Sequence, residues 1–151
     1  MIDKNRAISR LNGEKGDDNV LISTRGRYAV RILADMAKYG SGGVVPLKEI
    51  AVRQDISLKY IERIMSSLKE ANLVESVHGT LGGYKLTKEP EKYNLWEILV
   101  AAEGDLAPVA CLQSGSEPCK RSEECKTVRI WSEYYEVTKR FFENVILTEI
   151  T

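Results

Sequence analysis

The stretch that most constrains the fold is residues 46–86, where two short helical patterns are separated by a very small break. The first, "LKEIAVRQ", follows Pro46, which suits a helix start because the N–H it lacks would have no partner there. The second, "LKYIERIMSSLKEA", follows Ser57, a good helix cap, and its apolar residues recur at helical spacing. Only a few residues around Gln54–Ile56 lie between them. This layout predicts a helix-turn-helix.

The flanking segments extend this pattern on both sides. "STRGRYAVRILADMAKYG" has one apolar face and ends at Gly40, which predicts a helix before the helix-turn-helix. After it, "NLVESVHG" and "TLGGYKLT" are typical of two strands joined at a Gly-Gly turn. Helix, helix-turn-helix and hairpin is the order of a winged helix-turn-helix. The alternative is a small α+β core with no role in nucleic-acid binding.

Two further helices are predicted beyond the hairpin. "NLWEILVAAEG" has an apolar face and ends at Gly104. "TVRIWSEYYEVTKRFFENVILTEI" carries an apolar stripe formed by Val128, Trp131, Tyr135, Thr138 or Lys139, Phe142, Val145 and Ile146. A domain of this size has little core left for so long an aromatic helix, so we expect it to pack on a partner helix from a second subunit. The alternative is that it folds back on its own domain.

Charge is distributed unevenly, although the net charge is zero. Residues 22–88 carry eleven Lys and Arg against six Asp and Glu, whereas residues 89–151 carry seven against twelve. A basic front half favours a polyanionic partner. No apolar run approaches the ~20 residues of a membrane span, and the N-terminal segment lacks the apolar core of a signal peptide. We therefore expect a cytoplasmic protein with no membrane partner.

The predicted fold class is mainly α with a small β-hairpin wing, a winged helix-turn-helix followed by a long C-terminal dimerisation helix. Residues 1–21 are expected to form a flexible N-terminal tail. Residues 22–88 are expected to form the winged helix-turn-helix DNA-binding domain. The linking helix and the cysteine loop then occupy residues 89–125, and the dimerisation helix and C-terminus occupy residues 126–151.

All three cysteines fall in one polar stretch, "CLQSGSEPCKRSEEC", as Cys111, Cys119 and Cys125. Their spacing is C-x7-C-x5-C. An odd number cannot pair completely into disulfides, and the cytoplasm keeps thiols reduced. Free cysteines are usually buried singly as small apolar residues, which a charged loop does not allow. Metal binding is one interpretation of this cluster, and three ordinary thiols are another.

Three stretches carry a resemblance to a known family: "LISTRGRYAVRIL", "VPLKEIAVRQDISLKYIERIMSSLKEANLVESVHGTLGGYKL" and "ILTEI". Together they resemble the Rrf-type winged-helix transcription regulators, which include IscR-like, NsrR-like, RirA-like and CymR-like proteins. The resemblance covers residues 22–151. It implies a homodimer that binds a palindromic operator in double-stranded DNA through two winged helices, with the long C-terminal helices forming the dimer interface.

Members of this family differ in what they sense. IscR-like, NsrR-like and RirA-like proteins hold an iron–sulfur cluster on three cysteines in the loop before the dimer helix. The resemblance therefore implies a cluster, of the [2Fe-2S] type, on Cys111, Cys119 and Cys125, and thiolates are the usual ligands of such clusters. CymR-like proteins lack these cysteines and respond through a partner enzyme of cysteine biosynthesis. Control by thiol oxidation or by such an enzyme is therefore the alternative, and zinc is a third interpretation of the cysteines.

The fourth ligand of such a cluster is not assigned by the resemblance. IscR-like proteins have a histidine three residues after the last cysteine, where this chain has Val128. NsrR-like proteins have an aspartate where this chain has Arg27. The candidates here are Glu103, Asp105, Glu123, Glu124, a small thiol or water.

Candidate DNA contacts lie in three places. The second helix of the helix-turn-helix should enter the major groove by its N-terminal end, where the candidates are Ser57, Lys59, Tyr60, Glu62 and Arg63. The helix that precedes the helix-turn-helix begins with Arg25 and Arg27, which suit phosphate contacts. At the wing tip, IscR-like proteins carry an arginine, and this chain has His78 and Gly79. A neutral histidine would contact the minor groove more weakly.

A small redox or electron-transfer protein is the competing functional class, and the basic segment 22–88 argues against it. The sequence has no histidine beside a cysteine, no glycine loop of the kind that cradles phosphates and no evident pair of catalytic acids. We therefore expect no enzymatic activity.

Overall fold

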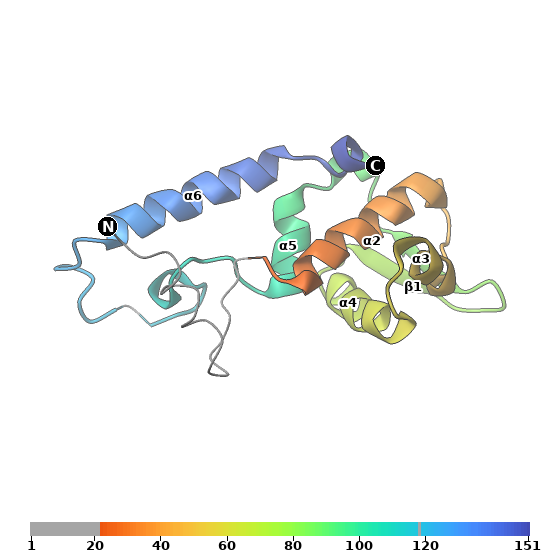
Figure 1. Cartoon of the computed structure of the whole chain (residues 1–151), viewed down its shortest axis with the longest axis horizontal. Helices are drawn as coiled ribbons and strands as arrows, with labels where there is room; N and C mark the ends of the chain where they lie inside the picture. The colour runs from red at the N-terminus through yellow and green to blue at the C-terminus, as the bar shows by residue number, and fades with distance from the viewer. Residues whose placement is uncertain (1–21, 118) are drawn as a thin grey trace, which may run out of the picture.

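The computed structural model of the chain describes residues 22–117 and 119–151, so the predicted N-terminal tail of residues 1–21 lies outside the described residues. The elements are, in order, α2 (Thr24–Gly40), α3 (Leu47–Gln54), α4 (Leu58–Glu70), β1 (Val74–Val77), β2 (Gly83–Leu86), η1 (Pro90–Lys92), α5 (Leu95–Glu103), η2 (Ala110–Leu112), α6 (Val128–Asn144) and η3 (Leu147–Ile150). The mainly α fold with a hairpin wing and a long C-terminal helix is confirmed. Helix α5 lies between α6 and the helices α2 and α4 (Figure 1).

The turn between α3 and α4 is built by two residues. Asp55 has a left-handed backbone with φ of 53°, a conformation that a short polar side chain tolerates. Ser57 then caps α4, because its hydroxyl accepts from the N–H of Tyr60. Between them, Ile56 points into the core. The predicted helix-turn-helix is thus present, with its break at residues 55–57.

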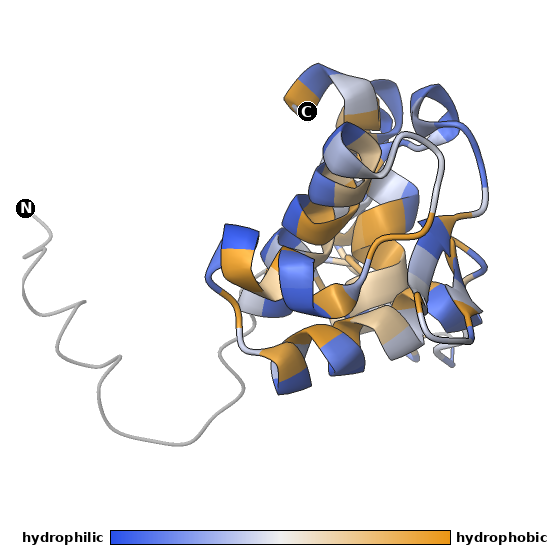
Figure 2. Cartoon of the chain, turned by 90° about the vertical axis from the view of Figure 1, so that its right-hand side faces the viewer, coloured by the Kyte–Doolittle hydropathy of each residue, from blue (hydrophilic) through white to orange (hydrophobic). Residues whose placement is uncertain are grey.

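The core lies between α2, α3, α4 and α5, and the predicted apolar faces form it. The fully buried side chains include Ile32, Leu33, Ile50, Ile61, Ile64, Met65, Leu68 and Ile98. Hydrophobic and hydrophilic residues alternate around these helices (Figure 2), as amphipathic elements require. Among residues 22–117 and 119–151, no helix is both long and apolar enough to cross a membrane.

The hairpin pairs β1 with β2 in antiparallel register, from Val74 opposite Leu86 to Val77 opposite Gly83. Val45, outside the two strands, adds one antiparallel bridge to Tyr84. A Cβ at Gly83 would lie 2.4 Å from the carbonyl oxygen of Val45. Only glycine therefore lets the two backbones approach this closely.

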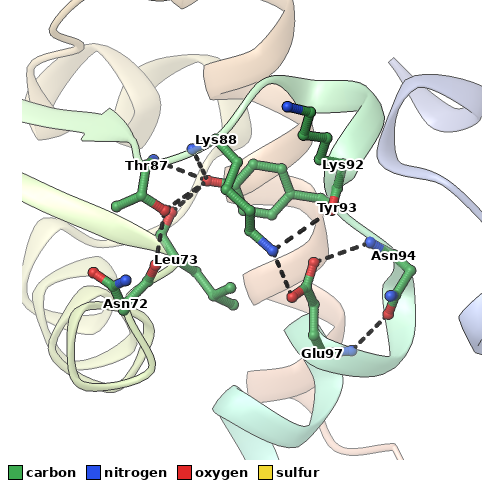
Figure 3. Close-up of polar contacts among 8 residues, drawn as sticks. All are labelled: Asn72, Leu73, Thr87, Lys88, Lys92, Tyr93, Asn94 and Glu97. Carbon is green, nitrogen blue, oxygen red and sulfur yellow. Dashed lines mark hydrogen bonds and ion pairs between the residues drawn. The ribbon is translucent and has the colours of Figure 1, made fainter.

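Tyr93 joins the wing to α5 (Figure 3). Its side chain is fully buried. The hydroxyl donates to the carbonyl of Leu73 at 2.7 Å and accepts from the N–H groups of Thr87 at 2.9 Å and Lys88 at 3.1 Å. Close by, Asn94 and Glu97 form a reciprocal capping box at the start of α5. One phenol thus holds both the entry to β1 and the exit from β2.

The C-terminal helix differs from its prediction in where it ends. Helix α6 stops at Asn144, and Val145 is extended, whereas the predicted stripe continued through Ile146. The next residues pair with the start of α5: Ile146 bridges Asn94, and the N–H of Leu147 donates to the carbonyl of Tyr93 at 2.9 Å. Leu147 is fully buried. Burying this leucine requires the chain to leave the helix.

Two apolar stripes run along α6. The predicted stripe is half-buried at Val128, Tyr135 and Phe142, and the ring of Tyr135 packs edge-on against Trp96 of α5 at 5.7 Å. A second stripe comprises Ile130 (55% exposed), Tyr134 (46%), Val137 (57%) and Phe141 (62%). Trp131, which belongs to the predicted stripe, remains 41% exposed. The surface that a partner helix could cover is therefore the second stripe, which sequence reasoning did not single out.

Candidate nucleic-acid interface and cysteine loop

Helix α4 presents most of the predicted major-groove residues on its exposed side. Lys59, Glu62 and Arg63 are exposed, while Ile61 and Ile64 beneath them are fully buried. Ser57 is exposed too, but its hydroxyl is engaged as the cap of the helix. Lys59 and Arg63 are cations that can contact phosphates or guanine. The carboxylate of Glu62 can accept from cytosine.

Tyr60 has a packing role that its sequence position did not reveal. It is half-buried, and its ring meets the ring of Tyr28 edge-on at 5.7 Å. The guanidinium of Arg31 lies over the ring of Tyr28, 5.1 Å from its centroid. Tyr60 thus helps to fix α4 against α2, so substituting it would affect stability as well as any contact with DNA.

A hollow lies between α4 and the start of α2. It is lined by Arg25, Tyr60, Arg63, Ile64, Ser66 and Ser67. The guanidinium of Arg25 donates to the hydroxyl of Ser67, which brings it to the side of α4. The lining residues include two arginines, two serines and a tyrosine, and no Asp or Glu is among them, which suits a phosphate. Arg27 is exposed and is directed elsewhere, donating to the hydroxyl of Thr24 at 3.0 Å.

The wing tip carries His78 and Gly79, both exposed. Gly79 has φ of 124°, and its carbonyl accepts from the N–H of Gly82 at 3.0 Å, which closes a tight loop. A groove runs from this loop to the starts of α3 and α4, with Lys48 and Glu62 on its other wall. Leu81 projects from the loop with 88% of its surface exposed, an apolar tip that sequence reasoning missed.

A partly buried ion pair links α2 to α3. Asp35, with 3% of its surface exposed, accepts two hydrogen bonds from Nε of Arg53 and one of 2.6 Å from its Nη2. The amide of Gln54 donates to the same carboxylate at 2.8 Å. The hydrogen bond to Asp35 raises the pKa of Arg53 further above its ordinary value. The pair thus holds α3, the first helix of the helix-turn-helix, onto α2.

The three cysteines lie on the segment between α5 and α6, at the opposite end of the molecule from the wing (Figure 1). Cys111 in η2 and Cys119 are exposed, and Cys125 is half-buried. Within residues 22–117 and 119–151, no three side chains of His, Cys, Asp or Glu gather as a metal site. The thiols are thus accessible and on one segment, but the loop must rearrange before all three could bind one cluster.

Cys125 differs in its surroundings because it precedes α6. Its sulfur lies 3.5 Å from the hydroxyl of Thr127, the residue at the N-cap of that helix. Hydrogen bonds with Thr127, from the side chain first and then the backbone, lower the pKa of the Cys125 thiol below its ordinary value. The thiolate, which is the form that ligates metals and reacts with oxidants, is therefore favoured here.

Asp105 organises the first part of the loop. Its carboxylate accepts from the N–H of Ala107 at 2.6 Å and from the N–H of Ser114 at 2.7 Å. Burial, followed by the neighbouring charge of Asp105, raises the pKa of the Tyr135 hydroxyl on α6. Asp105, one of the candidate fourth ligands, is thus already engaged in hydrogen bonds that hold the loop backbone. Glu123 and Glu124 are exposed.

Glu103, another of the candidate ligands, caps helix α2 instead. One carboxylate oxygen accepts from the N–H of Ser23 at 2.8 Å and from the N–H of Gly26 at 2.9 Å. The hydroxyl of Ser23 donates to the same carboxylate. A Cβ at Gly26 would lie 2.3 Å from that oxygen. The glycine between Arg25 and Arg27 was the only sequence signal of this contact.

Comparison with known proteins identifies the family. Residues 22–151 match the Rrf2 family, described as iron-dependent transcriptional regulators. The chain belongs to the Rrf2 family. The regulator IscR of Yersinia enterocolitica is 34% identical over 129 residues, which cover 85% of this chain and 77% of that protein.

Solved Rrf2-type structures have the same fold. CymR of B. subtilis, the global cysteine regulator, superposes with a TM-score of 0.66 at 33% identity, covering 85% of this chain and 94% of that one. IscR of T. potens superposes with a TM-score of 0.64 at 28% identity, covering 89% and 88%. This Rrf2 chain is therefore a DNA-binding transcriptional regulator and not an enzyme, as predicted.

Proposed function

We propose that this Rrf2 protein is a homodimeric regulator whose affinity for a palindromic operator is controlled by an iron–sulfur cluster on Cys111, Cys119 and Cys125. The observation that carries the proposal is the placement of all three cysteines on one accessible segment between α5 and α6. That segment adjoins α6, which carries the stripe available to a second subunit, and Glu103, which caps α2. A change in the conformation of this segment would therefore occur beside both the exposed stripe of α6 and the DNA-binding domain.

The donor set fits a cluster in kind. Thiolates are the preferred ligands of iron–sulfur centres, and Cys125 is held in conditions that favour its thiolate. Lys120 and Arg121 are exposed on the same segment, so they can offset thiolate charge. A bound cluster would supply chemistry sensitive to oxygen, nitric oxide or iron supply. Because Glu103 and Asp105 have other partners, the fourth ligand is best sought at Glu123, Glu124, a small thiol or water.

Iron and acid-labile sulfide content, measured after anaerobic reconstitution, tests the cluster. Wild type should bind both, and each of Cys111→Ala, Cys119→Ala and Cys125→Ala should bind little while keeping the wild-type circular dichroism spectrum. The loop lies outside the core, so losing one thiol should not unfold the chain. Wild type without iron, or variants with as much iron as wild type, would contradict the proposal.

The DNA contacts proposed on α4 are tested by one lysine. The DNA probe is the duplex enriched by wild type from a random-sequence pool. Lys59→Ala should weaken binding to this selected duplex by ~1–3 kcal/mol if Lys59 reads a base. Lys92→Ala, which removes the same charge from an exposed site in η1, is the control and should bind nearly as wild type does. Equal affinities of Lys59→Ala and wild type would mean that α4 does not enter the groove as proposed.

A second candidate keeps the regulator and omits the cluster. The three thiols do not converge within the described part of the loop, and CymR, described as a cysteine regulator, is as similar in fold as IscR. Control would then come from oxidation of the thiols or from an enzyme of cysteine biosynthesis. Wild type without iron that nevertheless changes its DNA affinity after peroxide treatment would favour this candidate.

A further inference from the structure

Helix α2 begins with an unfavourable distribution of charge. Its first turn contains Arg25 and Arg27 and no acidic residue. The N-terminus of a helix carries partial positive charge and unpaired N–H groups, so cations there are unfavourable. The helix nevertheless has to hold Arg25 beside α4, where Arg25 and Arg63 both line the hollow described above.

Glu103 supplies the missing negative charge from another element. It is the last residue of α5, and its carboxylate accepts from two N–H groups at the start of α2, those of Ser23 and Gly26. It also accepts the hydroxyl proton of Ser23, at 2.8 Å and 3.0 Å to its two oxygens. The Ser23 hydroxyl in turn accepts from the N–H of Arg25 at 3.0 Å. Two hydrogen bonds therefore connect the carboxylate to the backbone of Arg25.

The side chain of Arg25 continues this path to the recognition helix. Its guanidinium donates to the hydroxyl of Ser67 on α4. On the other side, Glu103 is followed at once by Gly104, whose φ of 90° ends α5 and starts the cysteine-bearing segment. A continuous series of hydrogen bonds thus connects Glu103, at the start of that segment, through α2 to α4. The contacts of Glu103 with Ser23 and of Arg25 with Ser67 join residues distant in sequence, and the contact of Ser23 with Arg25 is the cap of α2.

We infer that Glu103 is a positioning residue for DNA binding: it fixes the start of α2 so that Arg25 meets a backbone phosphate in the hollow beside α4. The inference rests on the proposed DNA contacts of Arg25. It gives Glu103 a role that does not require contact with DNA, and it makes the segment starting at Gly104 the neighbour of a DNA-contacting group. Gly26 is part of the same arrangement, because any larger residue at this position would displace the carboxylate of Glu103.

A double-mutant cycle tests this inference on the full-length protein with the selected duplex. Glu103→Gln keeps the size of the side chain but removes its charge, and it should weaken binding about threefold to tenfold with a salt slope lower by about one. Arg25→Gln should do the same. Because Glu103 acts through Arg25, the double variant should bind no more weakly than Arg25→Gln alone. Combined with Lys59→Ala, in contrast, the effect of Glu103→Gln should multiply.

The outcomes separate this inference from the proposed function. Wild type that selects no duplex contradicts the DNA-binding role and this inference together. Wild type that binds, with effects of Glu103→Gln and Arg25→Gln that multiply, overturns this inference alone, as does an unchanged affinity of Glu103→Gln. If Glu103→Gln does not fold, as judged by circular dichroism, Ser23→Ala replaces it in the cycle, because it removes the link between the carboxylate and Arg25 while the carboxylate stays.

Discussion

Single buried groups hold the wing and the helix-turn-helix in place. Tyr93 satisfies three backbone groups with one hydroxyl, and the buried carboxylate of Asp35 pairs with the partly exposed guanidinium of Arg53. A buried polar group without a partner costs much more than its hydrogen bond contributes, so each of these residues has a large effect on stability. Neither would contact DNA, yet both determine where the DNA-facing residues lie.

Tyr93→Phe removes one oxygen and leaves the groups at Leu73, Thr87 and Lys88 without that partner. The free energy of unfolding should fall by about 1–3 kcal/mol, as measured by urea denaturation at fixed protein concentration. Tyr39→Phe is the matched control, because Tyr39 is more than half exposed, and it should change stability by less than about 0.5 kcal/mol. Equal stabilities of Tyr93→Phe and wild type would contradict the role of this hydroxyl.

Cys125 should react with iodoacetamide at lower pH than an ordinary cysteine. Alkylation requires the thiolate, and a lowered pKa means that the thiolate forms as pH rises through a value below the usual ~8.5. Peptide mass spectrometry over a pH series gives the midpoint for this residue. Thr127→Val should raise it, whereas Thr138→Val, farther along α6, should not. A midpoint that Thr127→Val leaves unchanged would contradict the assigned cause.

The role of Glu103 shows what the sequence could not supply at this scale. Its position near the cysteines made it a candidate ligand, but its partners Ser23 and Gly26 lie 80 and 77 residues away. Contacts between such distant residues depend on how α5 packs on α2, which local pattern does not encode. The exposed residues of α4 were predictable, because helical periodicity alone decides which side faces outward.

At the scale of elements, α6 carries more apolar surface than this subunit can cover. Ile130, Tyr134, Val137 and Phe141 recur every three or four residues and are roughly half exposed. An exposed apolar stripe of this kind is typical of a helix that packs against another helix. The homodimer proposed above would bury it.

Phe141→Glu should therefore dissociate the dimer, because a carboxylate in an apolar helix seam loses its hydration without gaining a partner. Sedimentation at micromolar concentration measures the change. Arg129→Glu introduces the same side chain at an exposed site off the stripe and should remain dimeric. Phe142→Glu should lower stability as well, since Phe142 is half-buried within the subunit. A Phe141→Glu variant that stays dimeric would mean that this stripe is not the interface.

The elements differ in how far their sequence predicts them. The helix-turn-helix and the hairpin have local signals, such as Ser57 as a cap and the glycines between the strands, and both were predicted correctly. The turn itself is closed between Gly79 and Gly82, and Gly83 already belongs to β2. The end of α6 was not, because Ile146 and Leu147 follow the backbone of Asn94 and Tyr93 rather than helical periodicity. The half-buried stripe of α6 likewise depends on a tertiary contact, that of Tyr135 with Trp96 on α5.

At the scale of the whole molecule, the cysteine segment and the wing lie at opposite ends, with α5 between α6 and α2 (Figure 1). The proposed control of DNA binding from the cysteines would therefore have to pass through shared elements. Two are available: α6, through the arrangement of the proposed dimer, and the end of α5, through Glu103. A ligand changes DNA affinity only to the extent that it favours one arrangement over another.

The central claim is that the state of the cysteine segment sets the affinity for DNA. It is tested most directly by anaerobic titration of the selected duplex, at one salt concentration, with wild type before and after reconstitution with iron and sulfide. The two affinities should differ at least about tenfold, or 1.4 kcal/mol, and Cys111→Ala treated identically should show no difference. Equal affinities of reconstituted, cluster-containing wild type and the metal-free protein would contradict the claim.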